Sequence, residues 1–564
     1  MLERLDPGQR AAAVAPGPLL IIAGPGTGKT RTLTHRIAYQ VTERGVPAGH
    51  VLAITFTRRA AQEMRDRLAA LCPAQAGQLT VTTFHGLGLQ ILREHHDRAG
   101  LPARFAVAGE ADRLAAAAEL AGTERGGRTL LAGLDADPDA KLALRKELAG
   151  RGLVDFDGLI EMPGDLLAGD PAIAAGLRAR WPQVSVDEYQ DIDPAQYALL
   201  RRIAADGAGL TAIGDPDQAI YGFRGADVGI FARFAADFPA ATTVQLTTNY
   251  RSSPAVVAAA MQAIAPATLV RDRALAAARP DPPDPAVTFD EAADEHAEAG
   301  WIAATIDHLL GGTSFHSLDS GRADGHDDGK LGLGDIAVLY RTDAQAGPVG
   351  QALARAGLPF QKRSHDLLAR RAGVADIVRE LRLAQPGAGP GDDVPRRLAA
   401  TVRALAAVRG DRDPAVTDIR AAGDLLAPLA RRCGRDTERF LAEIALGAET
   451  DALDPRADAI TLLTLHAAKG LEFDVVFLAG CEAGLLPLRL PGTAADEAEE
   501  RRLLFVGMTR ARGRLLLSAA ARRSRHGREE AAGRSPFLAA IDSGLLARSA
   551  PRRARRTGYQ LRLL

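Results

Sequence analysis

The sequence predicts an α/β protein with two parallel sheets, each of which is interrupted by a helical insertion. Short apolar runs alternate with longer helical stretches in both halves of the chain, and this alternation is typical of parallel sheets. A glycine-rich loop directly follows the first apolar run, as in phosphate-binding α/β proteins. The length of 564 residues is enough for about four domain-sized units.

Apolar runs in the first half of the chain predict the strands of the first sheet. These runs are residues 19–23, 51–55, 184–186, 210–213 and 243–246. Between Arg93 and Arg180 the sequence becomes rich in Ala and Leu with helical spacing. We therefore expect an all-α insertion in the first lobe.

A second set of runs predicts the second sheet, with strands at residues 336–340, 460–464, 475–478 and 515–518. The Pro-rich residues 280–285 are expected to connect the lobes, and the Gly-rich residues 311–334 to form a mobile, solvated loop. Residues 385–454, which open with a Pro/Gly run, predict a helical insertion in the second lobe.

These assignments give five predicted parts. They are a first lobe (1–92 and 182–262), its insertion (93–181), a second lobe (263–384 and 455–545), a short insertion (385–454) and a tail (546–564). The tail contains a basic run at residues 552–556. We expect this run to be disordered, and weak contact with nucleic acid is the more specific alternative.

The glycine-rich loop has the composition of a nucleotide phosphate site. Its residues are Ala23, Gly24, Pro25, Gly26, Thr27, Gly28, Lys29 and Thr30. Small residues allow backbone N–H groups to surround phosphate oxygens, Lys29 neutralises the terminal phosphates, and the Thr30 hydroxyl can ligate Mg²⁺. Ala23 stands where the pattern normally has Gly, which is a small change.

Acidic residues follow a second predicted strand, as a Mg²⁺-nucleotide site requires. Asp187, directly after residues 184–186, is placed to hold Mg²⁺, and Glu188 is placed to polarise the attacking water. A third strand leads to Gln218, whose amide can contact the terminal phosphate. Such residues are also common on solvated surfaces, so the prediction depends on their occurring together.

Further motifs occur in a fixed order along nearly the whole chain: residues 55–64, 82–86, 214–226, 249–252, 465–473 and 499–511. Together with the two nucleotide motifs, this ordered set resembles the UvrD/Rep/PcrA-type superfamily 1 ATP-dependent DNA helicases. The resemblance implies two RecA-like motor lobes, ATP and Mg²⁺ as cofactors, and 3′–5′ movement along single-stranded DNA with unwinding of tailed or forked duplexes. It implies work in DNA repair, replication or recombination, with a repair protein as a conceivable partner.

The same resemblance implies roles for individual residues. Gln9 would read the adenine edge, Arg31 and Tyr250 would sandwich the base, and Glu472 would bind the ribose. Arg251 and Arg510 would complete the ATP site when the lobes close. Charge supplied in this way is often worth roughly 10³–10⁵ in rate. A surface ion pair with Glu499 or Glu500 is the structural alternative for Arg510.

Aromatic residues in these motifs are candidate platforms for DNA bases, because every base offers a π-face. Phe56, Phe84, Tyr221 and Phe223 are the stacking candidates. His85, Arg224 and His466 are expected near the DNA backbone or base edges. The core is the usual place for an aromatic ring, but these rings follow strand ends, where open sheets bind ligands. Phe223 replaces a Trp that is frequent in the family, so we expect a weaker grip on DNA.

Composition sets limits on the other classes of protein. The net charge of −1 gives no global attraction to nucleic acid, so a DNA path has to be local. Cys72, Cys433 and Cys481 are too few and too scattered for a zinc site, an iron–sulfur site or a disulfide framework. The sequence shows no signal peptide and no membrane-spanning run, so we expect a cytoplasmic location.

Three functions remain open at this point: a DNA translocase and helicase, a motor subunit of a recombinational nuclease complex, and a DNA clamp with an inactive ATP site. The second needs a nuclease domain or partner, and the sequence after Ser518 is short and poor in paired acids. The third conflicts with the presence of Lys29, Asp187, Glu188, Arg251 and Arg510. We therefore favour the first.

Overall fold

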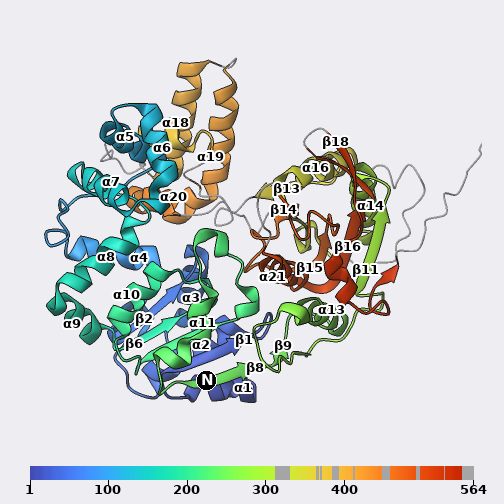
Figure 1. Ribbon diagram of the computed structural model, residues 1–564, viewed down its shortest axis with the longest axis horizontal. Coiled ribbons are helices and arrows are strands. Elements are labelled where there is room, and N and C mark those ends of the chain that lie inside the picture. Colours follow the sequence, from blue (N-terminus) through green and yellow to red (C-terminus); the bar gives the residue numbers. More distant parts are fainter. Residues whose placement is uncertain are drawn as a thin grey trace, which may run out of the picture. The chain divides into compact units, whose positions relative to one another are not determined.

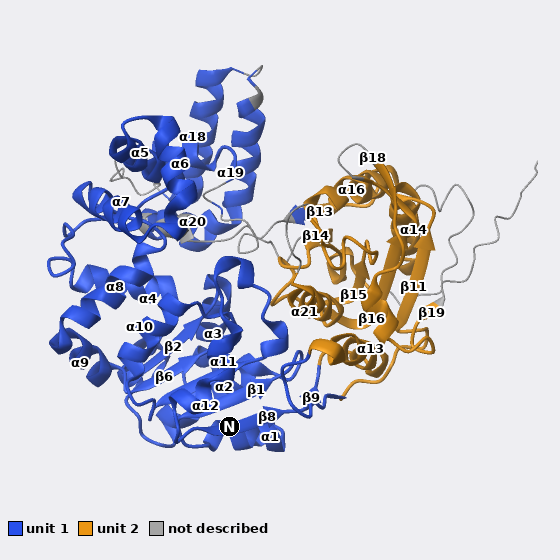
Figure 2. Cartoon of the chain, in the orientation of Figure 1, with its two compact units in different colours: residues 1–250, 268–276, 362–457 blue, residues 251–267, 277–361, 458–564 orange. Residues whose placement is uncertain are grey.

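The computed structural model describes residues 1–311, 331–363, 368, 371–383, 393–410, 413–446, 458–490, 496–525 and 528–548 (Figure 1). Two compact units are present (Figure 2). Unit 1 comprises residues 1–250, 268–276 and 362–457, and unit 2 comprises residues 251–267, 277–361 and 458–564. Most of the predicted loop at 311–334, the Pro/Gly run at 386–391 and the basic run at 552–556 lie outside the described residues.

Unit 1 is built on a six-stranded parallel sheet, which confirms the predicted α/β class. The strand order is β3-β2-β6-β7-β1-β8. The strands are β1 Leu19–Ala23, β2 Val51–Thr55, β3 Thr80–Thr83, β6 Gln183–Val186, β7 Leu210–Gly214 and β8 Thr242–Leu246. β3 was not among the predicted strands, because its Thr-rich sequence lacks an apolar run.

Alternate residues of each strand face opposite layers of helices, as the two-residue period of a strand requires. Leu19 and Ile21 pack with one layer, and Leu20 packs with the other. The first layer is α1 Pro7–Val14, α2 Lys29–Thr42 and α3 Arg58–Leu71. The second layer includes α4 Phe84–Glu94, α8 Gly158–Gly169, α9 Pro171–Arg180, α10 Pro194–Ala204, α11 Val228–Ala232 and α12 Phe234–Asp237. Both faces are thus buried, and ligands can reach the sheet only at its edge.

Helices fill most of residues 106–180, together with two short paired strands that the predicted all-α insertion did not include. They are β4 Ala106–Val107, α5 Glu110–Ala121, α6 Glu124–Gly133, α7 Pro138–Gly150 and β5 Leu153–Val154, followed by α8 and α9. A second helical group in unit 1 has its own apolar core. It consists of α17 Val374–Leu383, α18 Val394–Arg409, α19 Pro414–Cys433 and α20 Thr437–Leu446.

Unit 2 contains a seven-stranded sheet in the order β13-β14-β12-β15-β16-β11-β19. Its strands are β11 Val287–Ala292, β12 Ile336–Tyr340, β13 Phe360–Arg363, β14 Ile460–Thr464, β15 Phe473–Leu478, β16 Ala511–Ala520 and β19 Ala547–Arg548. The helices are α13 Pro254–Ile264, α14 Glu295–Leu309, α16 Ala346–Arg355 and α21 Glu497–Met508. A hairpin of β17 Arg522–Arg525 and β18 Arg528–Ala531 completes the described part of the unit.

The chain passes between the units more than once. After β9 Thr248–Asn249 it enters unit 2 through α13, and residues 268–276 then belong to unit 1 again. β10 Ala276–Ala277 pairs with β9 where the chain leaves for unit 2 once more. These units group residues by contact, and the five predicted parts remain a prediction.

Candidate functional site

The glycine-rich loop connects β1 to α2 at one edge of the unit 1 sheet. Gly26 and Gly28 have φ values of 70° and 79°, which L side chains rarely adopt. A Cβ atom on Gly28 would also come within 2.8 Å of the Gln9 side chain. The left-handed backbone at position 28 therefore favours glycine, and a side chain there would also displace the end of the Gln9 side chain.

Three neighbouring groups hold the carbonyl oxygens of this loop. The Asn249 side chain donates to Pro25 O (2.7 Å), the Tyr250 N–H donates to Gly26 O (2.8 Å), and the Gln9 amide donates to Thr27 O (2.9 Å). Asn249 is fully buried. Sequence reasoning placed Asn249 in a motif but gave it no role, since its partner lies 224 residues earlier in the chain. The loop is thus held in place by the protein itself.

Lys29, the first residue of α2, lies among side chains from two other strand ends. Its Nζ is 3.6 Å from Glu188 Oε1 and 3.5 Å from Gln218 Oε1. The strands are parallel, so the carboxyl ends of β1, β6 and β7 meet at one edge, where open α/β sheets bind ligands. The structure therefore brings together the three residues that the sequence predicts to act on the phosphates.

The buried Asp187 and the partly buried Glu188 form an acidic pair next to Lys29. Burial and the charge of Glu188 raise the pKa of Asp187 to about 7, against the opposing charge of Lys29. Glu188 has φ 50°, a left-handed conformation that is costly for a residue other than glycine and that occurs mostly at functional sites. A divalent cation would relieve the repulsion between the two carboxylates.

The donor set at this edge fits Mg²⁺, which prefers oxygen ligands and usually takes only one or two from the protein in addition to phosphate oxygens. Asp187 and the partly buried Thr30 supply such oxygens. No group of three or more His, Cys, Asp and Glu side chains that could hold a metal occurs among the residues described. A Mg²⁺ ion at this edge would thus depend on nucleotide phosphates for its remaining ligands.

Gln190 is a residue of the site that the sequence did not single out. Its side-chain N–H₂ donates to Glu188 Oε2 (2.5 Å), and its Oε1 accepts from the Asp215 N–H (3.0 Å). It thereby joins the acidic pair to the turn that carries Gln218. In the sequence, only its position three residues after Asp187 indicated that Gln190 belongs to the site.

The predicted adenine-binding residues gather around the start of α1. Gln9 and Asp6 form a capping box, and the Tyr250 hydroxyl donates to Asp6 Oδ2 at 2.7 Å. Tyr250 is 42% exposed, so part of its ring faces solvent. The exposed Arg31 donates instead to the Arg4 carbonyl. Gln9 and Tyr250 are thus joined through Asp6, whereas Arg31 points to the N-terminal residues.

The predicted catalytic arginines both belong to unit 2. Arg251 Nε pairs with Glu472 Oε2 at 2.6 Å, and Arg512 pairs with the other oxygen of Glu472 at 2.7 Å. Burial alone would raise the pKa of Glu472, but the two arginines lower it to about 2. Glu472 is therefore ionised and held between two cations at neutral pH.

Arg510 is 2% exposed, although arginine is rarely buried. Its guanidinium donates to the Val506 carbonyl (2.8 Å), the Leu471 carbonyl (3.2 Å) and the Thr509 hydroxyl (3.1 Å). Glu500, one of the two partners in the structural alternative for Arg510, pairs with Arg341 at 2.6 Å.

Aromatic DNA-binding candidates form one cluster on unit 1. The Phe56 and Tyr221 rings are stacked with centroids 5.1 Å apart, and the Phe223 ring lies 6.1 Å from Tyr221. Arg224 lies over both Tyr221 and Phe223. Phe223 is 63% exposed, whereas Tyr221 is buried. Phe223 thus offers the accessible face, and Tyr221 supports it from below.

Phe84 lies apart from this cluster. Its ring is 4% exposed and packs in the apolar core beneath the sheet. This burial favours a core role for Phe84 over the predicted stacking role, because the first residue of α4 turns its side chain towards the sheet.

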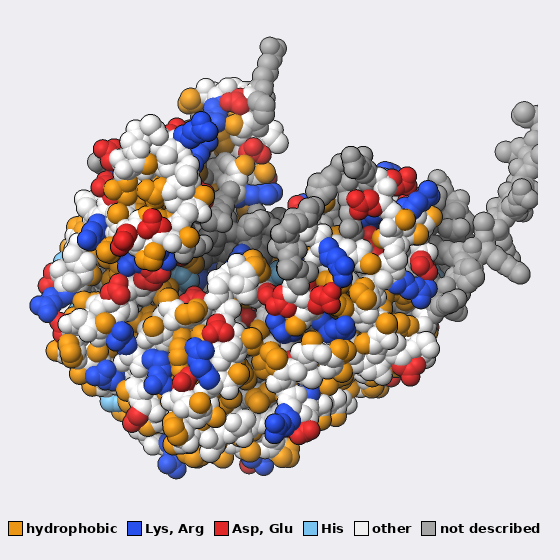
Figure 3. Space-filling model, in the orientation of Figure 1, with side chains coloured by type: hydrophobic (Ala, Val, Ile, Leu, Met, Phe, Trp, Pro, Cys, Tyr) orange, Lys and Arg blue, Asp and Glu red, His pale blue; other side chains and the backbone are white. Residues whose placement is uncertain are grey.

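The two histidines lie elsewhere. His85 stacks on Phe156 at 3.6 Å, and burial together with the charge of Arg58 lowers its pKa to about 3, so the ring is neutral at pH 7. His466 lies in unit 2, in the turn after β14. On the face shown in Figure 3, basic and acidic side chains are interspersed.

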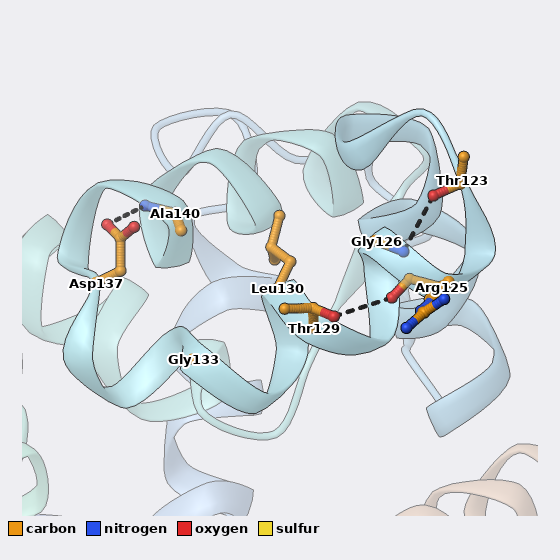
Figure 4. A pocket seen from close by; sticks show the side chains of 8 residues that line it. All are labelled: Thr123, Arg125, Gly126, Thr129, Leu130, Gly133, Asp137 and Ala140. Carbon is orange, nitrogen blue, oxygen red and sulfur yellow. Dashed lines mark hydrogen bonds between the residues drawn. The ribbon is translucent and has the colours of Figure 1, made fainter.

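A surface pocket in the first helical insertion is unrelated to these residues. It is lined by Thr123, Arg125, Gly126, Thr129, Leu130, Gly133, Asp137 and Ala140 (Figure 4). Thr123 and Asp137 accept from backbone N–H groups at helix starts, and Thr129 donates to the Arg125 carbonyl. These polar groups serve the local helices, so the pocket shows no sign of a catalytic role.

Among the described helices, none is both long and apolar enough to cross a membrane.

Comparisons with known proteins find helicase domains and relatives along most of the chain. The chain matches the UvrD/REP helicase N-terminal domain over residues 5–134 and 138–239, and the UvrD-like helicase C-terminal domain over residues 244–385 and 431–522. It is 35% identical to ATP-dependent DNA helicase UvrD2 of Mycobacterium tuberculosis, an alignment that covers 94% of this chain and 80% of the relative.

Two further relatives are similar over a comparable length. ATP-dependent DNA helicase PcrA of Bacillus subtilis is 31% identical over 97% of this chain and 87% of its own length. ATP-dependent DNA helicase UvrD1 of Mycobacterium tuberculosis is 31% identical over 98% of this chain and 87% of its own length. The chain therefore belongs to the UvrD-like family of ATP-dependent DNA helicases.

Proposed function

We propose that this protein hydrolyses ATP to move 3′ to 5′ along single-stranded DNA and to unwind tailed or forked duplexes. The observation that carries the proposal is the meeting of Lys29, Glu188 and Gln218 at one sheet edge. The same unit presents the exposed ring of Phe223. A phosphate site and a base-stacking face on one unit are what a nucleotide-driven DNA motor needs.

The chemistry at the phosphate end is divided among a few side chains. Lys29 neutralises the terminal phosphates, Glu188 orients and polarises the attacking water, and Gln218 contacts the terminal phosphate. Thr30 and Asp187 would hold Mg²⁺, which supplies further positive charge to the phosphates. The loop residues from Ala23 to Gly28 surround the phosphates, mainly through backbone N–H groups.

Residues at the base and the sugar orient the nucleotide. Gln9 reads the adenine edge, Tyr250 and Arg31 sandwich the base, and Glu472 binds the ribose. A carboxylate has about four lone-pair sites, so Glu472 can accept from a ribose hydroxyl while both arginines remain bound. Arg251 and Arg510 stabilise negative charge that develops in the transition state.

On the DNA side, Phe223 stacks on bases, with Tyr221 and Phe56 supporting it, and Arg224, His85 and His466 contact the backbone or base edges. The setting is repair, replication or recombination in the cytoplasm or nucleoid. The same proposal includes a repair protein as a binding partner.

The helical insertion in the second half suggests that movement is faster than strand separation. The match to the UvrD-like C-terminal domain omits residues 386–430, which include all of α18 and most of α19. The alignments with PcrA and UvrD1 extend over 661 and 693 positions, more than the 564 residues of this chain, so these relatives carry residues within the aligned region that this chain lacks. We propose that a reduced insertion gives a weaker grip on the duplex ahead of the motor.

Direction can be tested without a duplex. The protein is incubated with ATP, Mg²⁺ and an oligonucleotide that carries streptavidin on a biotin at either its 5′ or its 3′ end. A 3′–5′ motor displaces streptavidin from the 5′ end much faster than from the 3′ end. Equal displacement from both ends, or faster displacement from the 3′ end, would contradict the proposed direction.

Unwinding is then measured on 3′-tailed and 5′-tailed duplexes, with Lys29→Ala as the inactive control. We expect separation of the 3′-tailed duplex alone, and more slowly than streptavidin displacement. Rapid unwinding of long duplexes by the protein alone would contradict the role given to the short insertion.

A further inference from the structure

Arg273, which lies in none of the motifs above, belongs to a buried ion cluster. Its two terminal nitrogens bind both oxygens of Asp215 at 2.7 Å, and NH1 also binds Asp217 Oδ2 at 2.9 Å. The Arg273 side chain is 6% exposed and both aspartate side chains are fully buried. Two buried carboxylates thus share one buried guanidinium.

The two aspartates depend on this arginine for their charge balance. Burial would raise the pKa of Asp215, but the charge and hydrogen bonds of Arg273 lower it. Burial and the charge of Asp215 raise the pKa of Asp217, against the effect of Arg273. Removing one partner from such a cluster is strongly destabilising, because it leaves a buried charge without compensation.

Asp215 joins Arg273 to the phosphate site. Asp215 Oδ2 accepts from the Gln218 side chain at 2.7 Å and from Arg273 at the same distance. Gln218 in turn lies 3.5 Å from Lys29 Nζ. Three hydrogen bonds, through Asp215 and Gln218, therefore connect the guanidinium to Lys29.

Arg273 comes from an unusual stretch of chain. Residues 268–276 belong to unit 1, whereas the residues before them (251–267) and after them (277–361) belong to unit 2. Asp217 also holds the start of this stretch, since it accepts from the Thr268 hydroxyl and the Leu269 N–H, both at 2.6 Å. The turn with Gln218 is thus bound to the piece of chain that links the two units in sequence.

We propose that Arg273 is a positioning residue for ATP turnover. By binding Asp215 and Asp217 it holds Gln218 beside Lys29, and it fastens residues 268–276 to the turn that contacts the terminal phosphate. This inference rests on the proposed function. Because the same turn continues into Phe223 and Arg224, Arg273 also helps to relate nucleotide state to DNA affinity.

The test uses a double-mutant cycle on the full chain, because residues that act as one unit have non-additive effects. The variants are Arg273→Gln, Gln218→Ala and the double variant, together with Arg273→Lys. Arg523→Gln is the matched control, since Arg523 is 7% exposed and pairs with the buried Glu298 and Glu482 within unit 2. Each variant is assayed for kcat and KM with oligo-dT, for binding of a fluorescent ATP analogue and for thermal unfolding.

We expect Arg273→Gln to lower kcat by about tenfold while the affinity for the ATP analogue changes by less than about threefold. The double variant should be no slower than Gln218→Ala alone, and Arg273→Lys should recover part of kcat. Arg523→Gln should lower the melting temperature comparably yet leave kcat nearly unchanged.

Multiplicative losses in the double variant would overturn the proposal, and so would equal losses of kcat in the Arg273 and Arg523 variants. If Arg273→Gln does not fold, the cycle of Arg273→Lys with Gln218→Ala is read in the same way. A wild-type protein without DNA-stimulated ATPase refutes the proposed function itself. If the wild type is active and Arg273 variants match it, only the role of Arg273 fails.

A third readout is the affinity for single-stranded DNA with and without a non-hydrolysable ATP analogue. The ratio of the two affinities measures coupling between nucleotide and DNA. We expect Arg273→Gln to bring this ratio closer to one than Arg523→Gln does. An unchanged ratio would contradict the link from Arg273 to the DNA-binding turn.

Discussion

The phosphate-binding residues of unit 1 and the arginines of unit 2 are held in opposite ways. Lys29 lies within 3.6 Å of Glu188 and Gln218, which are its expected working neighbours. Arg251 instead pairs with Glu472, and Arg510 is bound to carbonyl groups of its own unit. Under the proposed function, the first set is already arranged for binding phosphates, whereas the second set would exchange partners before acting on them.

This contrast indicates how the free energy of the reaction is divided. Groups that are in place before nucleotide arrives can act in both the ground state and the transition state, whereas groups that reach the phosphates only later act mainly in the transition state. We therefore expect removal of the second set to lower turnover with little effect on ATP affinity. The following predictions run from the largest expected effect to the smallest.

Lys29→Ala should abolish ATP turnover while the protein stays folded and still binds single-stranded DNA. In the proposed function Lys29 serves the phosphates, whereas Phe223 and its neighbours bind DNA elsewhere on unit 1. Steady-state ATPase, thermal unfolding and DNA anisotropy measure the three properties. ATP hydrolysis near the wild-type rate would show that the phosphate site is misassigned.

Arg510→Ala should lower kcat by about 10²-fold or more and leave ATP binding largely intact, because its charge matters in the transition state. The residue is buried, so some loss of stability is expected as well, and Arg510→Lys separates lost charge from lost packing. Arg251→Ala should behave similarly. Parallel losses of ATP affinity and kcat would instead make these arginines ground-state or structural residues.

Phe223→Ala should weaken single-strand binding by about 1–3 kcal/mol, with little base preference and unchanged basal ATPase. Its melting temperature should stay near that of the wild type, since the ring is 63% exposed. Phe84→Ala is the matched comparison. Its ring is 4% exposed, and loss of a buried Phe costs about 3–5 kcal/mol of stability. If both variants melt alike, the distinction between the two rings is wrong.

Glu472→Gln should produce the smallest change. If Glu472 binds the ribose, the wild type prefers ATP over 2′,3′-dideoxy-ATP, and the variant loses most of this preference through a higher KM for ATP. Because the variant no longer holds Arg251 through an ion pair, its kcat should also be slightly lower. An unchanged preference between the two nucleotides would assign Glu472 to holding Arg251 and Arg512 alone.

The sequence was sufficient for the fold class, because both sheets consist largely of continuous apolar runs. It missed β3, whose Thr-rich residues carry no such signal, and β11, β13 and β19 of the second sheet. It also could not distinguish Phe84 from Phe223. Both rings lie in motifs near strand ends, but only three-dimensional packing determines which one is buried.

The site was predicted where residues are close in sequence to a strand end. Lys29, Glu188 and Gln218 each follow a strand, so the parallel topology alone brings them together. Arg273 gave no comparable signal. It lies in an irregular segment 56 residues after its partner Asp217, and nothing local indicates that the chain returns to unit 1 there.

The central claim is that one molecule links ATP hydrolysis to single-stranded DNA. The most direct test is the steady-state ATPase rate of the purified protein with and without oligo-dT, alongside Lys29→Ala. The account predicts slow hydrolysis by the wild type alone, a clear increase with oligo-dT, and no activity in the variant under either condition. A wild-type rate that is zero, or that does not change with DNA, would contradict it.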